Sequence, residues 1–258
     1  MQGKIYLVAT PIGNLEDITL RAIRILKEVD IIVAEDTRQT LKLLNHFEIS
    51  KQMISYHRHS SEEKKKEIIE KVKEGKNIAL VSDAGTPVIS DPGEEIVQTA
   101  LEKQIEVIPI PGPCALIAAL ITSGIDAKEF LFLGFLPLNK KIRKEKLNII
   151  KDSKQTTILY EAPHKLTQTL EELQEITNSR KIVLAREITK IHEEYITGTA
   201  KELVEKIKEP KGEFVIVIEK NNEQEENIFE NMSLDEHYKY YENLRIWQKR
   251  NNKKDSKR

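Results

Sequence analysis

The chain contains a single cysteine, Cys114, among 258 residues. One cysteine cannot form an internal disulfide, and such sparing use is typical of proteins from a reducing cytosol. No uninterrupted apolar run approaches the roughly 18 residues that a membrane-spanning helix needs, and the N-terminus has no secretory pattern. We therefore expect a cytoplasmic protein with no membrane partner.

An excess of charge of one sign is also lacking, because 41 basic residues stand against 42 acidic ones. Such a balance gives no global attraction to nucleic acid or to a membrane, so any basic binding surface must be local. Two basic stretches, Asn139–Lys146 and Arg245–Arg258, could follow RNA phosphates. Each is equally compatible with a solvated helix face or a loose tail.

Several motifs of common enzyme classes are absent. The chain has no G-x-G-x-x-G, no P-loop, no H-E-x-x-H and no G-x-S-x-G elbow. His57 and His59 have no cysteine nearby and precede a run of lysines, which is typical of a solvated loop rather than a zinc site. Dehydrogenase, metalloenzyme and serine hydrolase activities are therefore disfavoured, and we expect no metal.

Strand-like and helix-like segments alternate along the chain. The apolar runs 5–9, 31–34, 78–81 and 105–110, with the shorter candidate 53–57, each precede a helical pattern. This alternation predicts a mostly parallel five-stranded sheet with helices on both faces. The second half alternates less regularly, and "KIVLARE" and "EEYITGTA" are compatible with antiparallel neighbours. We predict an α/β protein with domains at 1–113 and 114–221 and a tail at 222–258.

Unusual loops follow the predicted strands. In open α/β sheets, ligands bind beyond the carboxyl ends of the strands, and five such ends carry "TPIGN", "AEDTR", "SDAGTP", "PIPGPCA" and "YEAPH". Asp83 follows a buried run and could hold a polar ligand, or it could cap a helix. Glu35, Asp36 and Arg38 are candidates for acid–base work, although Asp36 and Arg38 could form a purely structural ion pair.

These loops, together with "LVATPIGNLEDITLRA", "ALVSDAGTPVISDPG", "IPGPCALIAAL", "GFLP", "LAREITK" and "KGEFVIVIE", resemble the RsmI family. This is the family of bacterial 16S rRNA (cytidine-2′-O)-methyltransferases within the tetrapyrrole (corrin/porphyrin) methylase superfamily. The resemblance covers about Lys4 to Glu219. It implies a C-terminal mixed sheet, a methyl donor, S-adenosylmethionine (AdoMet), in the cleft between two domains, a homodimer, and a cytidine of the small-subunit decoding site as acceptor.

The resemblance also implies the residues of the donor site. Those carried over from the first half are Pro11, Gly13, Asp83, Ala84, Gly85, Thr86, Pro111, Gly112, Cys114 and Ala115. Those from the second half are Tyr160, Ala162, Ala185, Arg186, Gly212 and Glu213. The first strand and its turn, residues 5–14, are arranged as in a nucleotide site but lack a glycine-rich phosphate loop. AdoMet has no pyrophosphate, so a site for it needs no such loop.

Two alternatives to an rRNA methyltransferase stay open on sequence grounds. The same fold and donor could serve a tetrapyrrole or another small acceptor. The chain could instead be a non-catalytic RNA-binding relic, because the tail departs from the expected pattern. "SLDEHYKYYENL" resembles the start of the family's helical C-terminal module, but the basic helices expected after it do not follow.

Overall fold

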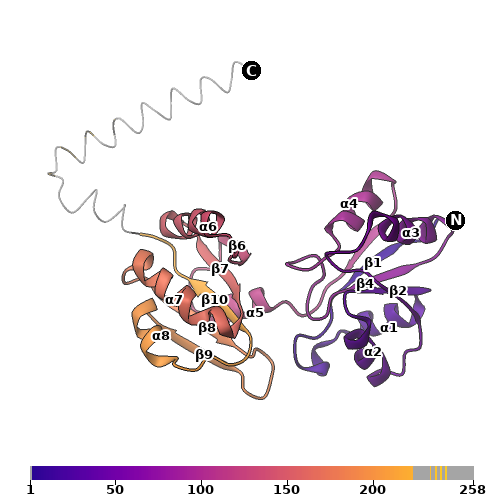
Figure 1. Cartoon of the computed structure of the whole chain (residues 1–258), viewed down its shortest axis with the longest axis horizontal. Coiled ribbons are helices and arrows are strands. Elements are labelled where there is room, and N and C mark those ends of the chain that lie inside the picture. The colour runs from indigo at the N-terminus through magenta and orange to yellow at the C-terminus, as the bar shows by residue number, and fades with distance from the viewer. Residues whose placement is uncertain (1, 223–232, 234–235, 237–238, 240–241, 243–258) are drawn as a thin grey trace.

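The computed structural model describes residues 2–222 together with 233, 236, 239 and 242. The described chain forms two α/β lobes, each built on its own sheet (Figure 1). Most of the expected tail, including Arg245–Arg258, lies outside the described residues. Among the described residues, no helix is both long and apolar enough to cross a bilayer.

The first sheet has five strands in the order β3-β2-β4-β1-β5, and all of its pairings are parallel. The sequence analysis predicted a mostly parallel sheet, and this is confirmed. The central strands β2 and β4 are buried at every position, as expected for strands covered on both faces. The strands are β1 (Ile5–Val8), β2 (Ile31–Ala34), β3 (Gln52–Ser55), β4 (Ile78–Val81) and β5 (Val107–Ile110).

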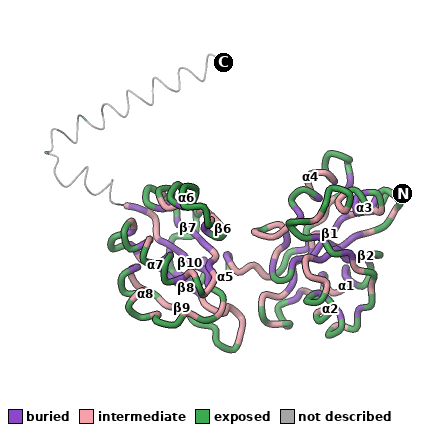
Figure 2. The backbone as a smooth tube through the Cα atoms, viewed as in Figure 1, coloured by how far each residue is buried: buried purple, intermediate pink, exposed green. Residues whose placement is uncertain are grey.

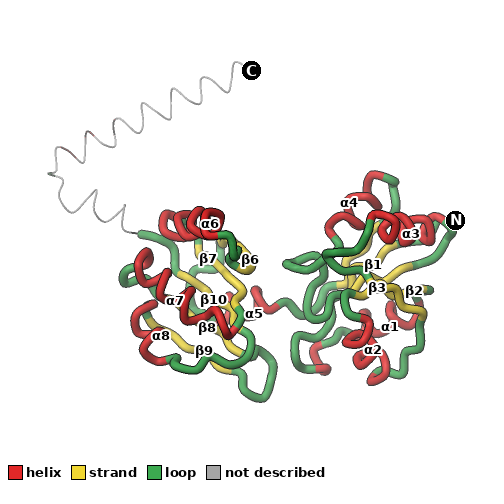
Figure 3. Tube along the Cα trace, viewed as in Figure 1, coloured by secondary structure: helices red, strands yellow, loops and turns green. Residues whose placement is uncertain are grey.

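Helices cover both faces of this sheet (Figure 3). Successive strand residues point to opposite faces, so Val33 and Leu80 pack under α3 and α4, whereas Ile32 and Ala79 pack under α1 and α2. Leu20, the first residue of α1, is 87% exposed, whereas Ala22, Ile25 and Leu26 are buried. The helices are α1 (Leu20–Glu28), α2 (Thr37–His46), α3 (Glu62–Lys73) and α4 (Glu94–Glu102).

The second sheet is mixed, with the order β6-β7-β10-β8-β9. Its only parallel pair is β6 with β7, and the other three pairs are antiparallel. The sequence analysis found "KIVLARE" and "EEYITGTA" compatible with antiparallel neighbours. The antiparallel pairing of β8 with β9, which brings Ala185 opposite Tyr195, confirms this. The strands are β6 (Phe130–Phe135), β7 (Thr156–Glu161), β8 (Ile182–Arg186), β9 (Glu194–Gly198) and β10 (Phe214–Ile218).

Helices also cover both faces of the second sheet, and Figure 2 shows the buried backbone concentrated in the two sheets. The helices α6, α7 and α8 pack on one face, while α5 covers the other through Leu116, Ala119 and Leu120. The first sheet ends at Ile110, and α5 already belongs to the second core. The helices are α5 (Ala115–Thr122), α6 (Lys140–Asp152), α7 (Pro163–Thr177) and α8 (Ala200–Lys206).

The two lobes touch beyond their covalent connection. The side chain of Lys190 lies against Gly13, where an added Cβ would come within 2.4 Å of the lysine Cγ. The Thr189 hydroxyl donates a hydrogen bond to a carboxylate oxygen of Asp17. These contacts join the turn after β1 to the loop after β8, on the side where the carboxyl ends of the first sheet's strands lie.

Candidate active site between the two sheets

A cavity of about 490 Å³ lies between the lobes, which is within the usual size range for a small-molecule site. Both sheets contribute to its walls. The first lobe and the connection supply Ile12, Ala84, Gly85, Thr86, Ile89, Ser90, Asp91, Cys114 and Ala115. The second lobe supplies Phe135, Tyr160, Glu161, Ala162, Pro163, His164, Ala185, Ile188, Glu213, Phe214 and Val215.

The wall from the first lobe is a tightly bonded turn after β4. Gly85 and Thr10 exchange both of their backbone hydrogen bonds, at 2.9 and 3.0 Å. Gly85 has φ 83°, in the left-handed region that glycine adopts without strain. The Thr86 hydroxyl donates to the backbone oxygen of Pro113 at 3.0 Å. The turn is therefore fixed to both β1 and the lobe connection.

The opposite wall is aromatic and lies beside the start of α5. The backbone N–H of Leu116 donates to the hydroxyl oxygen of Tyr160 at 3.3 Å. The Tyr160 ring makes edge-on contacts with Phe132 and Phe135, with centroids 4.9 and 5.6 Å apart. Burial raises the pKa of Tyr160 to about 12, so this hydroxyl stays neutral at physiological pH.

Three carboxylates line the cavity, and they differ in their partners. Glu161 is 3% exposed and accepts hydrogen bonds from the N–H of Ala162 and the hydroxyl of Thr169. Glu213 pairs with Lys190 at 2.8 Å. Asp91 forms no ion pair with the described residues. Burial raises the pKa of Asp91 to about 6, with a further rise from the charge of Glu35.

The structure brings part of the predicted donor site together around this cavity. Residues predicted from both halves of the sequence are among those that line it. They are Ala84, Gly85, Thr86, Cys114, Ala115, Tyr160, Ala162, Ala185 and Glu213. Their contact with AdoMet stays a prediction.

The other predicted donor-site residues do not line the cavity, and several have structural contacts of their own. Asp83 does not cap a helix; its Oδ1 accepts the backbone N–H of Asp36 at 2.9 Å. Arg186 donates to the backbone oxygen of Lys211. The residues outside the lining are Pro11, Gly13, Asp83, Pro111, Gly112, Arg186 and Gly212.

The three glycines of this group, Gly13, Gly112 and Gly212, lie against other parts of the protein, where a side chain would not fit. An added Cβ at Gly212, which has φ 86°, would come within 2.5 Å of the Glu187 side chain. At Gly112 the added atom would lie 2.9 Å from Cβ of Ala9. The contact of Gly212 with AdoMet stays a prediction.

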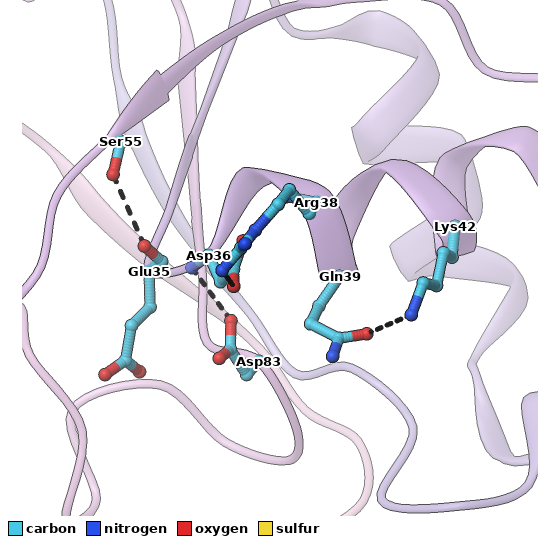
Figure 4. Close-up of polar contacts among 7 residues, drawn as sticks. All are labelled: Glu35, Asp36, Arg38, Gln39, Lys42, Ser55 and Asp83. Atoms are coloured by element: carbon cyan, nitrogen blue, oxygen red, sulfur yellow. Dashed lines mark hydrogen bonds and ion pairs between the residues drawn. The ribbon is translucent and has the colours of Figure 1, made fainter.

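The predicted catalytic trio lies beside the turn after β4 rather than in the cavity wall (Figure 4). Asp36 caps α2 and pairs with Arg38 at 2.6 Å, which holds the pKa of Asp36 down at about 2. The structural ion pair considered from the sequence is thus present. Burial and the charge of Asp83 raise the pKa of Glu35.

Sequence reasoning missed several lining residues, among them Ile89, Asp91, Phe135 and His164. A signal was available for most of them, because they belong to or adjoin "SDAGTPVISDPG", "GFLP" and "YEAPH".

His57 and His59, which the sequence analysis assigned to a loop, contact each other: Nδ1 of His57 accepts a hydrogen bond from the backbone N–H of His59. Among the described residues, no group of three or more His, Cys, Asp and Glu is placed to hold a metal.

Solved structures of related architecture share this fold. Uroporphyrin-III C-methyl transferase from Thermus thermophilus, solved with S-adenyl homocysteine, superposes with a TM-score of 0.61 at 18% identity, covering 84% of this chain and 97% of that one. The methyltransferase CobJ gives 0.65 at 18% identity, covering 84% and 94%. At these identities the likeness shows the fold alone.

Sequence relatives are much closer. The chain is 50% identical over 245 residues to ribosomal RNA small subunit methyltransferase I of Halalkalibacterium halodurans, covering 93% of this chain and 85% of that protein. It is 45% identical over 232 residues to the protein of the same name from Escherichia coli O157:H7, covering 88% and 81%. Residues 4–204 match the family of tetrapyrrole (corrin/porphyrin) methylases. The chain therefore belongs to the tetrapyrrole methylase family and, within it, to the ribosomal RNA small subunit methyltransferase I family.

Proposed function

We propose that this protein transfers a methyl group from AdoMet to the ribose 2′-oxygen of cytidine 1402 in 16S rRNA. The observation that carries the proposal is the cavity between the two sheets, in a chain that is 50% identical to a named small-subunit rRNA methyltransferase. We further propose that the acceptor is presented by the 30S subunit in the cytoplasm and that the protein is a homodimer.

The lining of the cavity suits AdoMet. Small residues, Ala84 and Gly85 on one wall and Ala185 on the other, leave room for a flat ring, and Ile188 and Val215 offer it apolar surface. The three carboxylates that line the cavity suit a ligand with two positive centres, a sulfonium and an ammonium.

When bound, AdoMet supplies an already electrophilic methyl group, so the protein's task is mainly positioning. The walls would hold the donor and the sugar on opposite sides of the methyl carbon and exclude water from between them. No pyrophosphate cradle is required. The catalytic roles of Glu35, Asp36 and Arg38 stay a prediction; Arg38, which is 87% exposed, is placed where a substrate phosphate could reach it.

A second hollow, of about 380 Å³, lies on the second lobe between α6 and the start of α7. We name it the basic hollow; it is lined by Pro137, Leu138, Lys140, Arg143, Lys144, Leu147, Lys165, Gln168 and Glu172. Arg143 is neutralised by Glu172 at 2.6 Å, whereas Lys140, Lys144 and Lys165 form no ion pair among the described residues. These three lysines are available to RNA phosphates.

The cavity and the basic hollow are neighbours along the chain in two places, at residues 135–137 and at residues 164–165. Phe135 lines the cavity and Pro137 the hollow; His164 lines the cavity and Lys165 the hollow. A strand whose target nucleotide enters the cavity would therefore meet the lysines with its flanking phosphates. This placement supports an acceptor that is an RNA strand more than it supports a compact tetrapyrrole.

Neutralising two lysines of the basic hollow is expected to weaken RNA binding without affecting the donor. In Lys144→Ala/Lys165→Ala, the slope of log affinity for 30S subunits against log salt should fall by about 2 in magnitude, because each lost phosphate contact removes about one unit. Filter binding over a salt series measures this slope. Lys66→Ala, an exposed lysine on α3, is the matched control and should leave the slope unchanged; equal slopes in all proteins would refute the RNA track.

Exposed apolar surface on α5 supports the proposed homodimer. Ile117 and Ile121, on the outer side of α5, are 42% and 71% exposed, which is unusual for two isoleucines of one short helix. Sedimentation equilibrium measures the oligomeric state directly.

Mapping of methyl groups on 30S rRNA after incubation with the pure protein and AdoMet tests the main proposal. We expect one new 2′-O-methyl group at the decoding-site cytidine. Label transfer to uroporphyrinogen instead of 30S subunits would favour the small-molecule alternative, and absence of AdoMet binding in titration calorimetry would favour a non-catalytic RNA-binding role.

A further inference from the structure

One row of side chains crosses the second sheet beside the cavity. Phe135 on β6 lies opposite Tyr160 on β7. Tyr160 also lies opposite Val215 on β10, which in turn lies opposite Ala185 on β8. Residues directly opposite each other on neighbouring strands share one face of a sheet, and all four line the cavity. We call these four residues the cavity row; it changes from aromatic at the edge strand β6 to small at β8.

The cavity row is buried at one end and open at the other. Ala185 and Val215 are 0% and 5% exposed, whereas Phe135 is 52% exposed. Neighbouring strands lie about 4.8 Å apart, so Phe135 and Val215, on strands two apart, are separated by roughly 10 Å. One nucleobase does not cover both. If the adenine of the donor occupies the buried end, the ring of Phe135 is left for a second flat group.

A bulge in β6 turns Phe135 toward the cavity. The pairing of β6 with β7 shifts register between Phe132 and Gly134, so β6 holds one extra residue there, and Gly134 has φ 63°. Without the shift, Phe132 and Phe135 would point to opposite faces, because they are three positions apart. With it, both rings contact Tyr160 edge-on, at 4.9 and 5.6 Å between centroids. The fold therefore departs from a regular strand at the point that aims this exposed ring.

The chain passes from Phe135 directly into the basic hollow. Leu138, which is also exposed, lines the hollow together with Lys140 and Lys144. Sites for single-stranded RNA combine aromatic side chains, on which bases stack, with cations that follow the phosphates. An open ring between the cavity and a group of lysines therefore favours a base of the RNA over a further part of the donor.

We propose that Phe135 is the platform on which the base of the target nucleotide stacks, an inference that rests on the proposed function. A nucleotide that is modified inside a cavity has to leave its neighbours in the strand. Stacking on Phe135 holds the released base at the open end of the cavity row, its ribose faces the donor, and the flanking phosphates reach the lysines of the basic hollow. Because stacking tolerates any base, Phe135 positions the nucleotide without selecting cytidine.

The test compares Phe135→Leu with the wild type in methyl transfer to 30S subunits. Leucine keeps apolar bulk but has no aromatic face, so we expect kcat/KM for the subunits to fall by about 5–150-fold, the usual contribution of one stacked base. Phe135→Tyr, which keeps the ring, should retain most of the wild-type value. Phe130→Leu makes the same change at an exposed phenylalanine of β6 that does not line the cavity, and this matched control should keep the wild-type rate.

Two further measurements separate stacking from donor binding and from phosphate contacts. The dissociation constant for AdoMet, measured by titration calorimetry, should be the same in Phe135→Leu and the wild type, because Val215 and Ala185 are unchanged. The slope of log affinity for 30S subunits against log salt should also stay the same, since a neutral ring contacts no phosphate.

Unchanged kcat/KM in Phe135→Leu would overturn the inference. An equal loss in Phe135→Tyr would also overturn it, because the aromatic face would then not be what matters. A loss of AdoMet affinity in Phe135→Leu would place the ring in the donor site instead. Absence of transfer by the wild type would refute the proposed function, and the inference with it.

Discussion

Replacing Arg143 by methionine is expected to lower the free energy of unfolding by about 3–5 kcal/mol, the usual cost of removing one partner from a buried ion pair. The Arg143 side chain is 8% exposed and lies under α7, where its Nε and Nη2 donate to Glu172. Its Nη2 also donates to the Thr169 hydroxyl at 2.7 Å. Methionine fills similar volume but leaves the Thr169 oxygen without this donor and leaves the Glu172 carboxylate with the neutral amide of Gln168 in place of a cation.

Replacing Arg143 should also weaken the hydrogen bonds that support the cavity wall. Thr169 donates onward to Glu161 at 2.6 Å, and Glu161 accepts the N–H of Ala162, which lines the cavity. One chain of hydrogen bonds therefore runs from the basic hollow to the proposed donor site. We expect weaker AdoMet binding in Arg143→Met even at temperatures where the variant is folded, because the cavity wall loses part of its support.

Urea denaturation of Arg143→Met measures the effect, and thermal unfolding should shift by roughly 6–20 °C. The neighbouring Lys141→Met is a matched control on an exposed position and should change stability by less than about 0.5 kcal/mol. Adding Glu172→Gln to Arg143→Met should recover part of the loss, since it removes the uncompensated charge. A loss below about 1 kcal/mol in the single variant would mean that the buried pair is not structural.

Much of the fold could be predicted from the sequence because its signals are local. Runs such as Ile31–Ala34 and Ile78–Val81 are short and apolar at every position, as expected for strands covered on both faces, and the structure places both inside the parallel sheet. The start of the buried face of α1 could not be predicted in this way, because helical spacing alone does not say which residue begins that face; Leu20 is 87% exposed, whereas Ile25 and Leu26 are buried.

The candidate site could be predicted only in part, because a motif does not say which of its side chains turn inward. Asp83 and Arg186 look like ligand groups at strand ends, yet both are engaged with neighbouring backbone. Asp91 lies eight positions after Asp83 in the same motif, but left-handed residues at Val88 and Ser90 direct it, and no periodicity reports such a conformation. Contacts between distant segments decide these orientations.

Replacing Gly85 by valine is expected to weaken AdoMet binding by roughly 10–100-fold, because overpacking of a close-packed wall costs about 1–3 kcal/mol and each 1.4 kcal/mol is a factor of ten. Gly85 lines the cavity with φ 83°, and both of its backbone groups are bonded to Thr10, so the turn cannot rotate to relieve a side chain. An added Cβ would already lie 3.2 Å from Ile12, and the branches of valine must point into the remaining space.

The matched control for this prediction is Gly124→Val. Gly124 has φ 61°, so valine suffers a similar backbone strain there, but an added Cβ meets only the Lys181 amine at 3.6 Å and the residue does not line the cavity. Both variants should therefore lose stability by about 1–3 kcal/mol, while calorimetric titration with AdoMet should separate them. If Gly85→Val bound AdoMet as tightly as Gly124→Val, the donor would have to lie away from the turn after β4, and the cavity between the two sheets could not be its site.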